Sequence, residues 1–190
     1  MITITRSPDR NRQRGISLVE VMVGATIAAF VMTGVMTTFL FLGRSGANIS
    51  NYAEMESEAR VGLEYFAQDT RQASELTWNS ANSVTLTVNG VAITYAHDAA
   101  AKTFTRQAGA GATTTMIDGI LTFKFDGYMI TGAQVDVSDL STIAKRDAAS
   151  DVTKQLQVYL KASRVTTTVS AATNTVLSAR YILRNKRVSA

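Results

Sequence analysis

Residues 16–43 read ISLVEVMVGATIAAFVMTGVMTTFLFLG, and Glu20 is the one charged residue among them. The stretch from Val21 to Leu42 is an uncharged run of 22 residues. As an α-helix that rises about 1.5 Å per residue, this run extends roughly 33 Å, enough to cross a hydrocarbon core of about 30 Å. The run therefore predicts a helix that spans a membrane once.

The charges on either side of the run predict its orientation. Four arginines precede it, Arg6, Arg10, Arg12 and Arg14, whereas Arg44 is the one basic residue just beyond it. Because positive residues tend to stay on the cytoplasmic side, we expect the amino terminus in the cytoplasm and the body of the chain outside it. An ordinary secretory signal has an apolar region of only about 7–15 residues, so the length of the run favours an anchor.

Glu20 is the anomaly in this run. An acidic side chain inside a transmembrane helix costs on the order of 2.5–3.5 kcal/mol, less near the interface, so such a residue usually has a partner and a role. One interpretation is that Glu20 lies at the level of the lipid head groups and needs no partner. The other is that a cation at the same depth pairs with its carboxylate.

The residues just before the run carry a resemblance to a known family. Arg14-Gly15-Ile16-Ser17-Leu18-Val19-Glu20 resembles the prepilin signal of type IV pilin-like proteins, which is a basic leader, Gly, a hydrophobic residue, Ser or Thr, Leu, a hydrophobic residue and Glu. The resemblance implies that a membrane-embedded prepilin peptidase cleaves between Gly15 and Ile16 and methylates Ile16. The family more often has Phe where this chain has Ile16, which is also large and apolar.

Cleavage at this position would supply the cation that Glu20 lacks. Gly15 has no side chain to obstruct the approach of the backbone to a catalytic site. The new α-amino group of Ile16 is a cation at about the depth of Glu20. In a stack of parallel helices, the carboxylate of one subunit would meet the ammonium group of its neighbour. Such a pair fixes the register between neighbouring helices more than it adds to the net stability of the assembly.

The helical pattern continues beyond the apolar run. Apolar residues recur at three- and four-residue spacings with most acidic residues on other faces, which predicts an amphipathic helix. The chain has a single proline, at position 8, so none interrupts the pattern. We expect one helix from about Ser17 to about Leu76. Its apolar positions after the run are Ile49, Tyr52, Ala59, Leu63, Phe66 and Ala73.

After Trp78 the pattern changes to that of β-strands. Apolar and polar residues alternate on both sides of Asn89-Gly90, a dipeptide that favours a two-residue type I′ turn. Residues 108–115 and 163–175 are expected as loops, although their threonines could instead extend a hairpin. The other expected strands are Lys102–Arg106, Gly119–Phe125, Gln155–Ser163 and Val176–Leu183. The pattern predicts an α+β fold in which the long helix packs on an antiparallel sheet. The resemblance to type IV pilin-like proteins implies that this is the pilin fold.

Two further segments resemble one branch of the family. The stretch LEYFAQDTRQA, residues 63–73, is similar to the helix end of J-type minor pseudopilins and PilW-type minor pilins, in which an aspartate, an arginine and an alanine recur. The stretch ARYILRN, residues 179–185, is similar to their last strand, which often ends in Arg-Asn. The resemblance as a whole covers residues 14–76 and 176–185.

The resemblance implies a division of the chain into four parts. A leader at residues 1–15 is removed, and residues 16–43 form the transmembrane helix and later the filament core. Residues 44–78 form the amphipathic half of the helix. Residues 79–190 form an extracytoplasmic antiparallel β domain.

Composition argues against several other classes of protein. There is no cysteine, and His97 is the one histidine, which excludes thiolate metal sites and most general-base triads. Residues 1–15 carry four arginines and Asp9, or +3 of the net +4, so the rest of the chain has no basic stripe for nucleic acid. We expect neither a cofactor nor a metal. Calcium binding is left open for four acidic residues whose spacing does not match a 12-residue calcium loop, Asp136, Asp139, Asp147 and Asp151.

The expected function is structural rather than enzymatic. The resemblance implies a minor pilin or pseudopilin that joins a type IV pilus or a type II secretion pseudopilus at its tip or in its initiation. Its expected partners are the prepilin peptidase, other pilin or pseudopilin subunits, the inner-membrane assembly platform and, before assembly, membrane lipid; no direct contact with nucleic acid is expected. It would reside in the inner membrane and then in the filament. The alternative is a single-pass, membrane-anchored extracytoplasmic binding protein that forms no filament.

Overall fold

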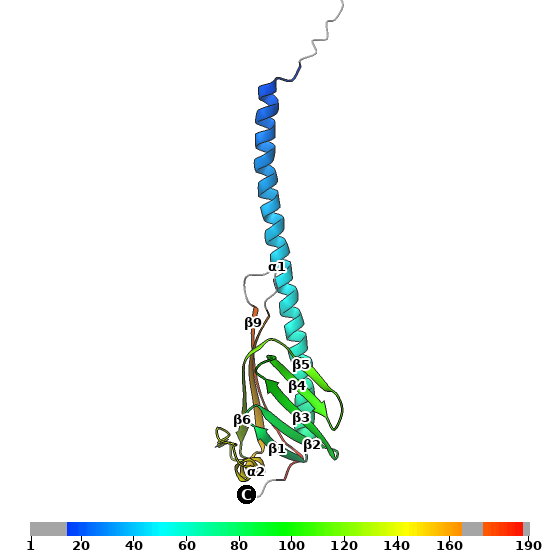
Figure 1. Cartoon of the computed structure of the whole chain (residues 1–190), viewed down its shortest axis with the longest axis vertical. Helices are drawn as coiled ribbons and strands as arrows, with labels where there is room; N and C mark the ends of the chain where they lie inside the picture. The colour runs from blue at the N-terminus through cyan, green and yellow to red at the C-terminus, as the bar shows by residue number, and fades with distance from the viewer. Residues whose placement is uncertain (1–14, 165–172, 188–190) are drawn as a thin grey trace, which may run out of the picture. The chain divides into compact units, whose positions relative to one another are not determined.

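The computed structural model describes residues 15–164 and 173–187 of the chain. The contacts divide the chain into two units, residues 1–44 and residues 45–190. The long helix α1, Leu18–Gln72, begins in the first unit and ends in the second (Figure 1). Nine strands and a short helix, α2, follow it in the described part of the second unit. The α+β fold predicted from the sequence is confirmed.

Helix α1 buries one stripe in the second unit. From Met55 onward its buried residues recur every three or four positions, as expected for a helix with one face against a core. The helix ends at Gln72, so the expected end near Leu76 was wrong. Leu76 and Trp78 belong instead to strand β1, where they pair with Leu86 and Val84 of the next strand. The buried residues of α1 are Met55, Ala59, Gly62, Phe66, Ala67, Asp69 and Thr70.

The first sheet is a five-stranded antiparallel meander in the order β1-β2-β3-β4-β5. The expected turn at Asn89-Gly90 is confirmed, with φ of 51° and 80° at the two residues. Strand β5 lies in part of the stretch expected as a loop, and its threonines extend a hairpin with β4. The strands are β1 Glu75–Ser80, β2 Ser83–Val88, β3 Val91–Asp98, β4 Thr103–Ala108 and β5 Thr113–Ile117.

A second antiparallel sheet has the order β7-β6-β8-β9, so the prediction of one sheet was wrong. Strand β8 extends into the stretch 163–175 as far as Arg164, and β9 begins within it at Thr173. The rest of that stretch lies outside the described residues. The strands are β6 Ile120–Tyr128, β7 Gln134–Val135, β8 Gln155–Arg164 and β9 Thr173–Ile182.

Helix α2, Ile143–Val152, was not predicted. It begins after Thr142, whose side chain accepts a hydrogen bond from the backbone N–H of Lys145, the usual arrangement of an N-cap. The helix packs on β1, where the hydroxyl of Ser150 accepts a hydrogen bond from the backbone N–H of Trp78 at 2.9 Å. Its short apolar face and its polar sequence gave little signal for a helix.

The core joins α1 to both sheets through the ring of Phe66, which is fully buried. Its centroid lies 5.0 Å from that of Tyr95 in the first sheet and 5.8 Å from that of Phe125 in the second. It also lies 5.7 Å from the ring of Tyr181 in β9. Aromatic rings at these separations stabilise one another beyond the burial of their area, so Phe66 holds the three elements together.

Candidate functional site

The predicted cleavage site lies at the edge of the described residues. Gly15 and Ile16 are both exposed, and the side chain of Ile16 is 76% exposed. Apart from its two chain neighbours, no described residue has a heavy atom within 4 Å of the point where a Cβ on Gly15 would be. The predicted leader arginines, Arg6, Arg10, Arg12 and Arg14, lie outside the described residues. Among the described residues, therefore, nothing packs against the bond after Gly15.

In the first turn of α1, Ser17 has a role that was not identified from the sequence. The Ser17 hydroxyl accepts a hydrogen bond from the backbone N–H of Glu20 at 3.2 Å, and the Ser17 carbonyl accepts one from Val21 at 3.2 Å. Ser17 is thus the N-cap, and Glu20 stands at the third helical position. Ser-x-x-Glu is the sequence signal of a capping box and could have predicted this start.

The position of Glu20 suits a carboxylate for two reasons. It lies in the first turn, where the partial positive charge of the helix amino terminus favours an acid. It also lies only four residues along the chain from Ile16, whose amino group the predicted cleavage would free. The ion pairs found within residues 15–164 and 173–187 do not include Glu20. Its carboxylate is therefore available to a cation from outside the chain.

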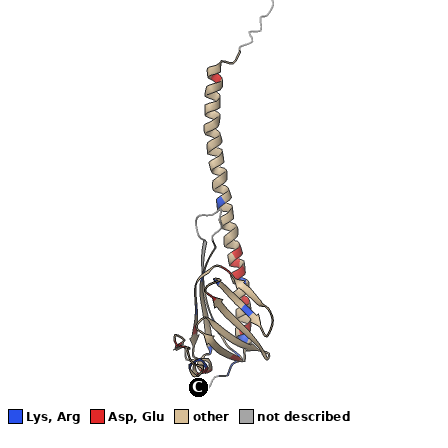
Figure 2. Ribbon diagram, in the orientation of Figure 1, with Lys and Arg blue, Asp and Glu red and all other residues tan. Residues whose placement is uncertain are grey.

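The amino-terminal part of α1 is apolar on all sides and wholly exposed. Every residue from Gly15 to Arg44 is exposed. The most apolar 18-residue window has a mean hydropathy of 2.0 and no buried residue, so its length and composition suit a membrane span. Figure 2 shows how little charge this part of the helix carries. Exposure of so much apolar surface to water is unfavourable, so lipid or other helices must cover it.

The polar side chains within the apolar run are satisfied inside the helix. Thr26, Thr33, Thr37 and Thr38 each donate a hydroxyl hydrogen bond to the carbonyl oxygen four residues earlier, at 2.8–3.0 Å. A hydroxyl without a partner would be costly in hydrocarbon. These threonines therefore leave no unsatisfied hydrogen-bonding group on the surface of the span. Glu20 is its one ionisable residue.

A second cluster attaches the end of α1 to the first sheet. Asp69 is 7% exposed, and its Oδ2 accepts hydrogen bonds from the Tyr95 hydroxyl at 2.6 Å and from Arg106 Nε at 2.9 Å. The same Arg106 Nε lies 3.1 Å from the Tyr95 hydroxyl oxygen. Burial, together with the bond to the Asp69 carboxylate, raises the pKa of Tyr95 far above its usual range. The tyrosine therefore stays a neutral donor at any physiological pH.

The other residues of the two resembling segments also hold the end of α1. The guanidinium of Arg71 lies 5.8 Å from the ring centroid of Tyr181 in β9. Ala73 is fully buried, and its N–H donates to the Asp69 carbonyl as the helix ends. The side-chain amide of Asn185 donates to the Gln72 carbonyl at 3.4 Å. Both segments therefore meet at the junction of α1 with the β domain, and their role there is structural.

Removal of the Asp69 carboxylate is expected to destabilise the β domain. Asp69→Ala would leave the Tyr95 hydroxyl and the Arg106 guanidinium without their shared acceptor in a buried place. Loss of one member of a buried ion pair costs about 3 kcal/mol. The measurement is urea unfolding of the full chain in detergent, followed by the fluorescence of Trp78, the one tryptophan and a fully buried one.

Glu64→Ala is the matched control, because Glu64 is an exposed carboxylate on the same helix. This variant should stay within about 0.5 kcal/mol of the unchanged protein. Equal midpoints for the Asp69 and Glu64 variants would contradict the anchoring role of Asp69.

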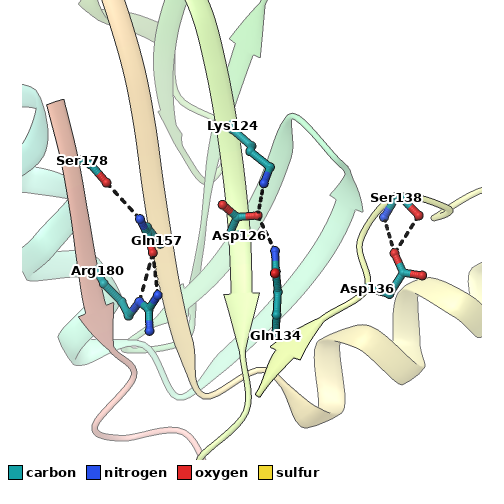
Figure 3. A network of polar contacts seen from close by, with 8 residues as sticks. All are labelled: Lys124, Asp126, Gln134, Asp136, Ser138, Gln157, Ser178 and Arg180. Atoms are coloured by element: carbon teal, nitrogen blue, oxygen red, sulfur yellow. Dashed lines mark hydrogen bonds and ion pairs between the residues drawn. The ribbon is translucent and has the colours of Figure 1, made fainter. Parts of the chain in front are cut away.

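The acidic residues considered for calcium do not gather into one site. Asp136 accepts hydrogen bonds from the N–H and hydroxyl of Ser138 (Figure 3), and Asp139 accepts the same pair from Ser141. Asp139 also forms an ion pair with Lys145. In the described ranges, no three His, Asp or Glu side chains are placed to hold a metal ion. Each of these two aspartates thus stabilises its own turn.

The one histidine is half-buried and packs between the two sheets. The ring of His97 in β3 stacks on Phe123 in β6, with centroids 4.7 Å apart and an angle of 17° between the planes. Both ring nitrogens are buried and have no hydrogen-bond partner. Burial lowers the pKa of His97, so the neutral ring is favoured. Its geometry is that of a packing residue.

Comparison with known families gives a match at the amino-terminal end of the chain. Residues 10–36 match the model of the prokaryotic N-terminal methylation motif. The matched stretch contains Gly15, Ile16, the Ser17 cap, Glu20 and most of the exposed apolar run. No curated protein matches the chain.

Proposed function

We propose that this chain, which carries a type IV pilin-like signal before one apolar helix, is a minor pilin or pseudopilin. A prepilin peptidase cleaves it between Gly15 and Ile16 and methylates the amino group of Ile16. The processed chain then enters a filament through its apolar helix. Before assembly it is a single-pass protein of the inner membrane, with its amino terminus in the cytoplasm and its β domain outside.

The observation that carries this proposal is the coincidence of three features within one short stretch. The methylation motif covers the predicted bond, the bond is exposed, and one helical turn later a carboxylate stands without an ion-pair partner among the described residues. A simple anchor needs no carboxylate at that depth. A subunit that must align its helix with a neighbour's new amino group does need one.

The proposal extends to the place of the subunit in the assembly. The segments around Asp69 and Asn185 resemble J-type minor pseudopilins and PilW-type minor pilins, and both lie where α1 joins the β domain. We infer a position at the tip of a type IV pilus or type II secretion pseudopilus, or a role in its initiation. Its partners are other subunits and the inner-membrane assembly platform. Removal of residues 1–15 and a division of the helix near residue 43 belong to the same proposal, whereas the boundary between helix and β domain lies at Gln72 rather than at residue 78.

Intact mass of the protein isolated from its own cells tests the proposal directly. We expect a polypeptide that begins at Ile16 and is one methyl group heavier than its sequence. Deletion of the prepilin peptidase should restore the mass of a chain that begins at Met1. A chain that keeps residues 1–15 in peptidase-positive cells would instead indicate a permanently anchored extracytoplasmic protein that forms no filament.

A further inference from the structure

A cavity lies between α1 and the last two strands of the first sheet. It has a volume of about 480 Å³, and ligand sites in proteins commonly measure about 300–1,000 Å³. On the α1 side it is lined by Val61 and Tyr65, which are 46% and 48% exposed. These two residues stand four positions apart, so they lie on the same side of the helix. We call this space the β5 cavity.

One end of the β5 cavity is closed by direct contact between helix and strand. Gly62 of α1 is buried, and a Cβ built there would lie 3.0 Å from Ile117 Cγ1 and 3.3 Å from Met116 Cβ. The end of β5 therefore packs closely against α1. Residues 113–115, at the beginning of the strand, are exposed. The strand is thus fixed at one end and accessible along the rest of its length.

Strand β5 has one edge with which no described strand pairs. It pairs with β4 on its other edge and is the last strand in the order of the first sheet (Figure 1). Thr114 and Thr115 both line the cavity. Because successive side chains of a strand point to opposite faces, a cavity that touches both residues reaches the edge of the strand. An open edge offers backbone N–H and C=O groups to a further strand.

Arg106 of β4 brings further hydrogen-bond donors to the β5 cavity. Its Nε is held by Asp69 and Tyr95, and its Cζ lies 5.7 Å from the ring centroid of Tyr65. The Nη1 and Nη2 atoms have no hydrogen-bond partner among the described residues. The side chain is 24% exposed and lines the cavity. Two ordered donor groups are therefore available to an acceptor that enters the cavity.

The charges around the β5 cavity favour an uncharged ligand. Arg106 is already paired with Asp69, and Glu58, which also lines the cavity, has an interaction of its own. An acidic ligand would meet these two carboxylates, and a basic ligand would meet the guanidinium. A backbone carbonyl accepts from a guanidinium without adding charge. The exposed surfaces of Val61 and Tyr65 suit an apolar side chain.

We propose that the β5 cavity binds an extended, uncharged peptide segment of another protein as an additional strand of the first sheet. The segment pairs with the open edge of β5, and one of its carbonyl oxygens accepts from Arg106. Every second side chain faces α1, where an apolar one packs on Val61 and Tyr65. The inference goes beyond the proposed function and requires only the β domain, whether or not residues 1–15 have been removed.

Selection from a random peptide library tests the proposal. The probe is a library of short linear peptides displayed on phage, and the target is the full chain in detergent. We expect the enriched sequences to be uncharged and rich in β-branched and aromatic residues, which favour strands. A labelled synthetic copy of the most enriched peptide then gives a dissociation constant by fluorescence anisotropy. Failure to enrich any sequence, or enrichment of acidic or basic sequences, would overturn the proposal.

A pair of variants places the bound peptide on the protein. Val61→Glu puts a charge against the apolar side chain of the peptide and should weaken binding about tenfold. Ile143→Glu is the matched control, because Ile143 is an exposed apolar residue of α2 that does not line the β5 cavity. The control should bind as the unchanged chain does. Equal affinities of the two variants would mean that the peptide binds elsewhere and would refute the proposal.

Arg106→Lys tests the guanidinium. The lysine keeps a cation for Asp69 but loses the planar pair of terminal donors, and binding should weaken about fivefold. Because Arg106 also holds the end of α1, the unfolding midpoint of this variant is measured alongside by the fluorescence of Trp78. If the variant does not fold, Val61→Glu, at an exposed position, still decides whether the cavity is the site.

Backbone pairing is tested on the peptide itself. N-methylation of one set of alternate residues removes the N–H groups that face β5, and N-methylation of the other set removes those that face away from it. We expect one methylated peptide to bind at least about tenfold more weakly than the other, since several hydrogen bonds are lost together. Equal affinities would show that the peptide adds no strand, contrary to the proposal.

A titration of the protein distinguishes another protein from a second copy of this chain. If a second copy occupied the β5 cavity, the apparent affinity for the peptide would fall as the concentration of the chain rises, because the copies would compete with the peptide. We expect the dissociation constant to be independent of that concentration. A fall that Val61→Glu abolishes would assign the cavity to a second copy and overturn the proposal.

Discussion

Gly15→Leu is expected to leave residues 1–15 attached to every copy of the chain. A leucine side chain at the cleaved bond would separate the backbone from a catalytic site that accepts only glycine, and the bond would not be cut. The uncleaved chain has no free α-amino group at Ile16, so no cation forms at the depth of Glu20. Intact mass should show the full-length polypeptide without a methyl group, and no copies should appear in filaments.

The exposure of Gly15 makes this result easy to interpret. In the part of the chain that the structure describes, no residue beyond its two neighbours lies within 4 Å of where a Cβ would stand, so the leucine disturbs no packing there. Gly24→Leu is the matched control, because Gly24, in the first part of α1, is also an exposed glycine with open space around it. The control should be processed normally. Processing of the Gly15 variant at an unchanged rate would contradict the assigned cleavage site.

Glu20→Ala is expected to permit processing and to reduce assembly. The variant leaves the bond after Gly15 intact, and it keeps the helix start because Glu20 donates to Ser17 through its backbone N–H. In the filament, the amino group of the neighbouring subunit would then be buried without its carboxylate. Loss of one partner of a buried pair costs about 3 kcal/mol, or on the order of a hundredfold in association. Quantification of the subunit in sheared filaments, relative to the membrane pool, measures the effect.

Two further variants identify the cause of such a loss. Glu20→Gln keeps the shape and the hydrogen-bonding capacity of the side chain but removes the charge, so it should also assemble poorly. Thr26→Ala removes only a hydroxyl that bonds within its own helix, and it should assemble normally. Normal incorporation of the Glu20→Ala chain would refute the charge-pairing hypothesis and leave the processing prediction untouched.

Local signals account for the parts of the structure that were predicted. The uncharged run from Val21 to Leu42 and the absence of proline after Pro8 suffice for a long helix, since each residue of a helix bonds only to residues four positions away. The turn at Asn89-Gly90 likewise depends on two residues that tolerate positive φ. The cap by Ser17 could have been predicted on the same grounds.

Other elements escaped prediction because their neighbours in space decide them. The first residues of β1 were predicted as helix, but Leu76 and Trp78 pair with β2 in the first sheet. Helix α2 has a weak apolar face and depends on its contact with β1 through Ser150. Lys186 is 7% exposed although lysine is rarely buried, because its ammonium donates to the carbonyls of Ser150 and Thr153 at the end of α2.

The sequence by itself determined the apolar span, the glycine before it and the acid inside it, since each depends on residues adjacent along the chain and on their partition between water and lipid. Only the tertiary structure decided that Asp69 binds Tyr95 and Arg106, and that Lys124 and Arg180 share one outer face. Those residues are far apart in sequence, and strand order and register bring them together. The spacing of residues along the chain does not predict the strand order, because the strand order depends on how the two sheets pack around Phe66.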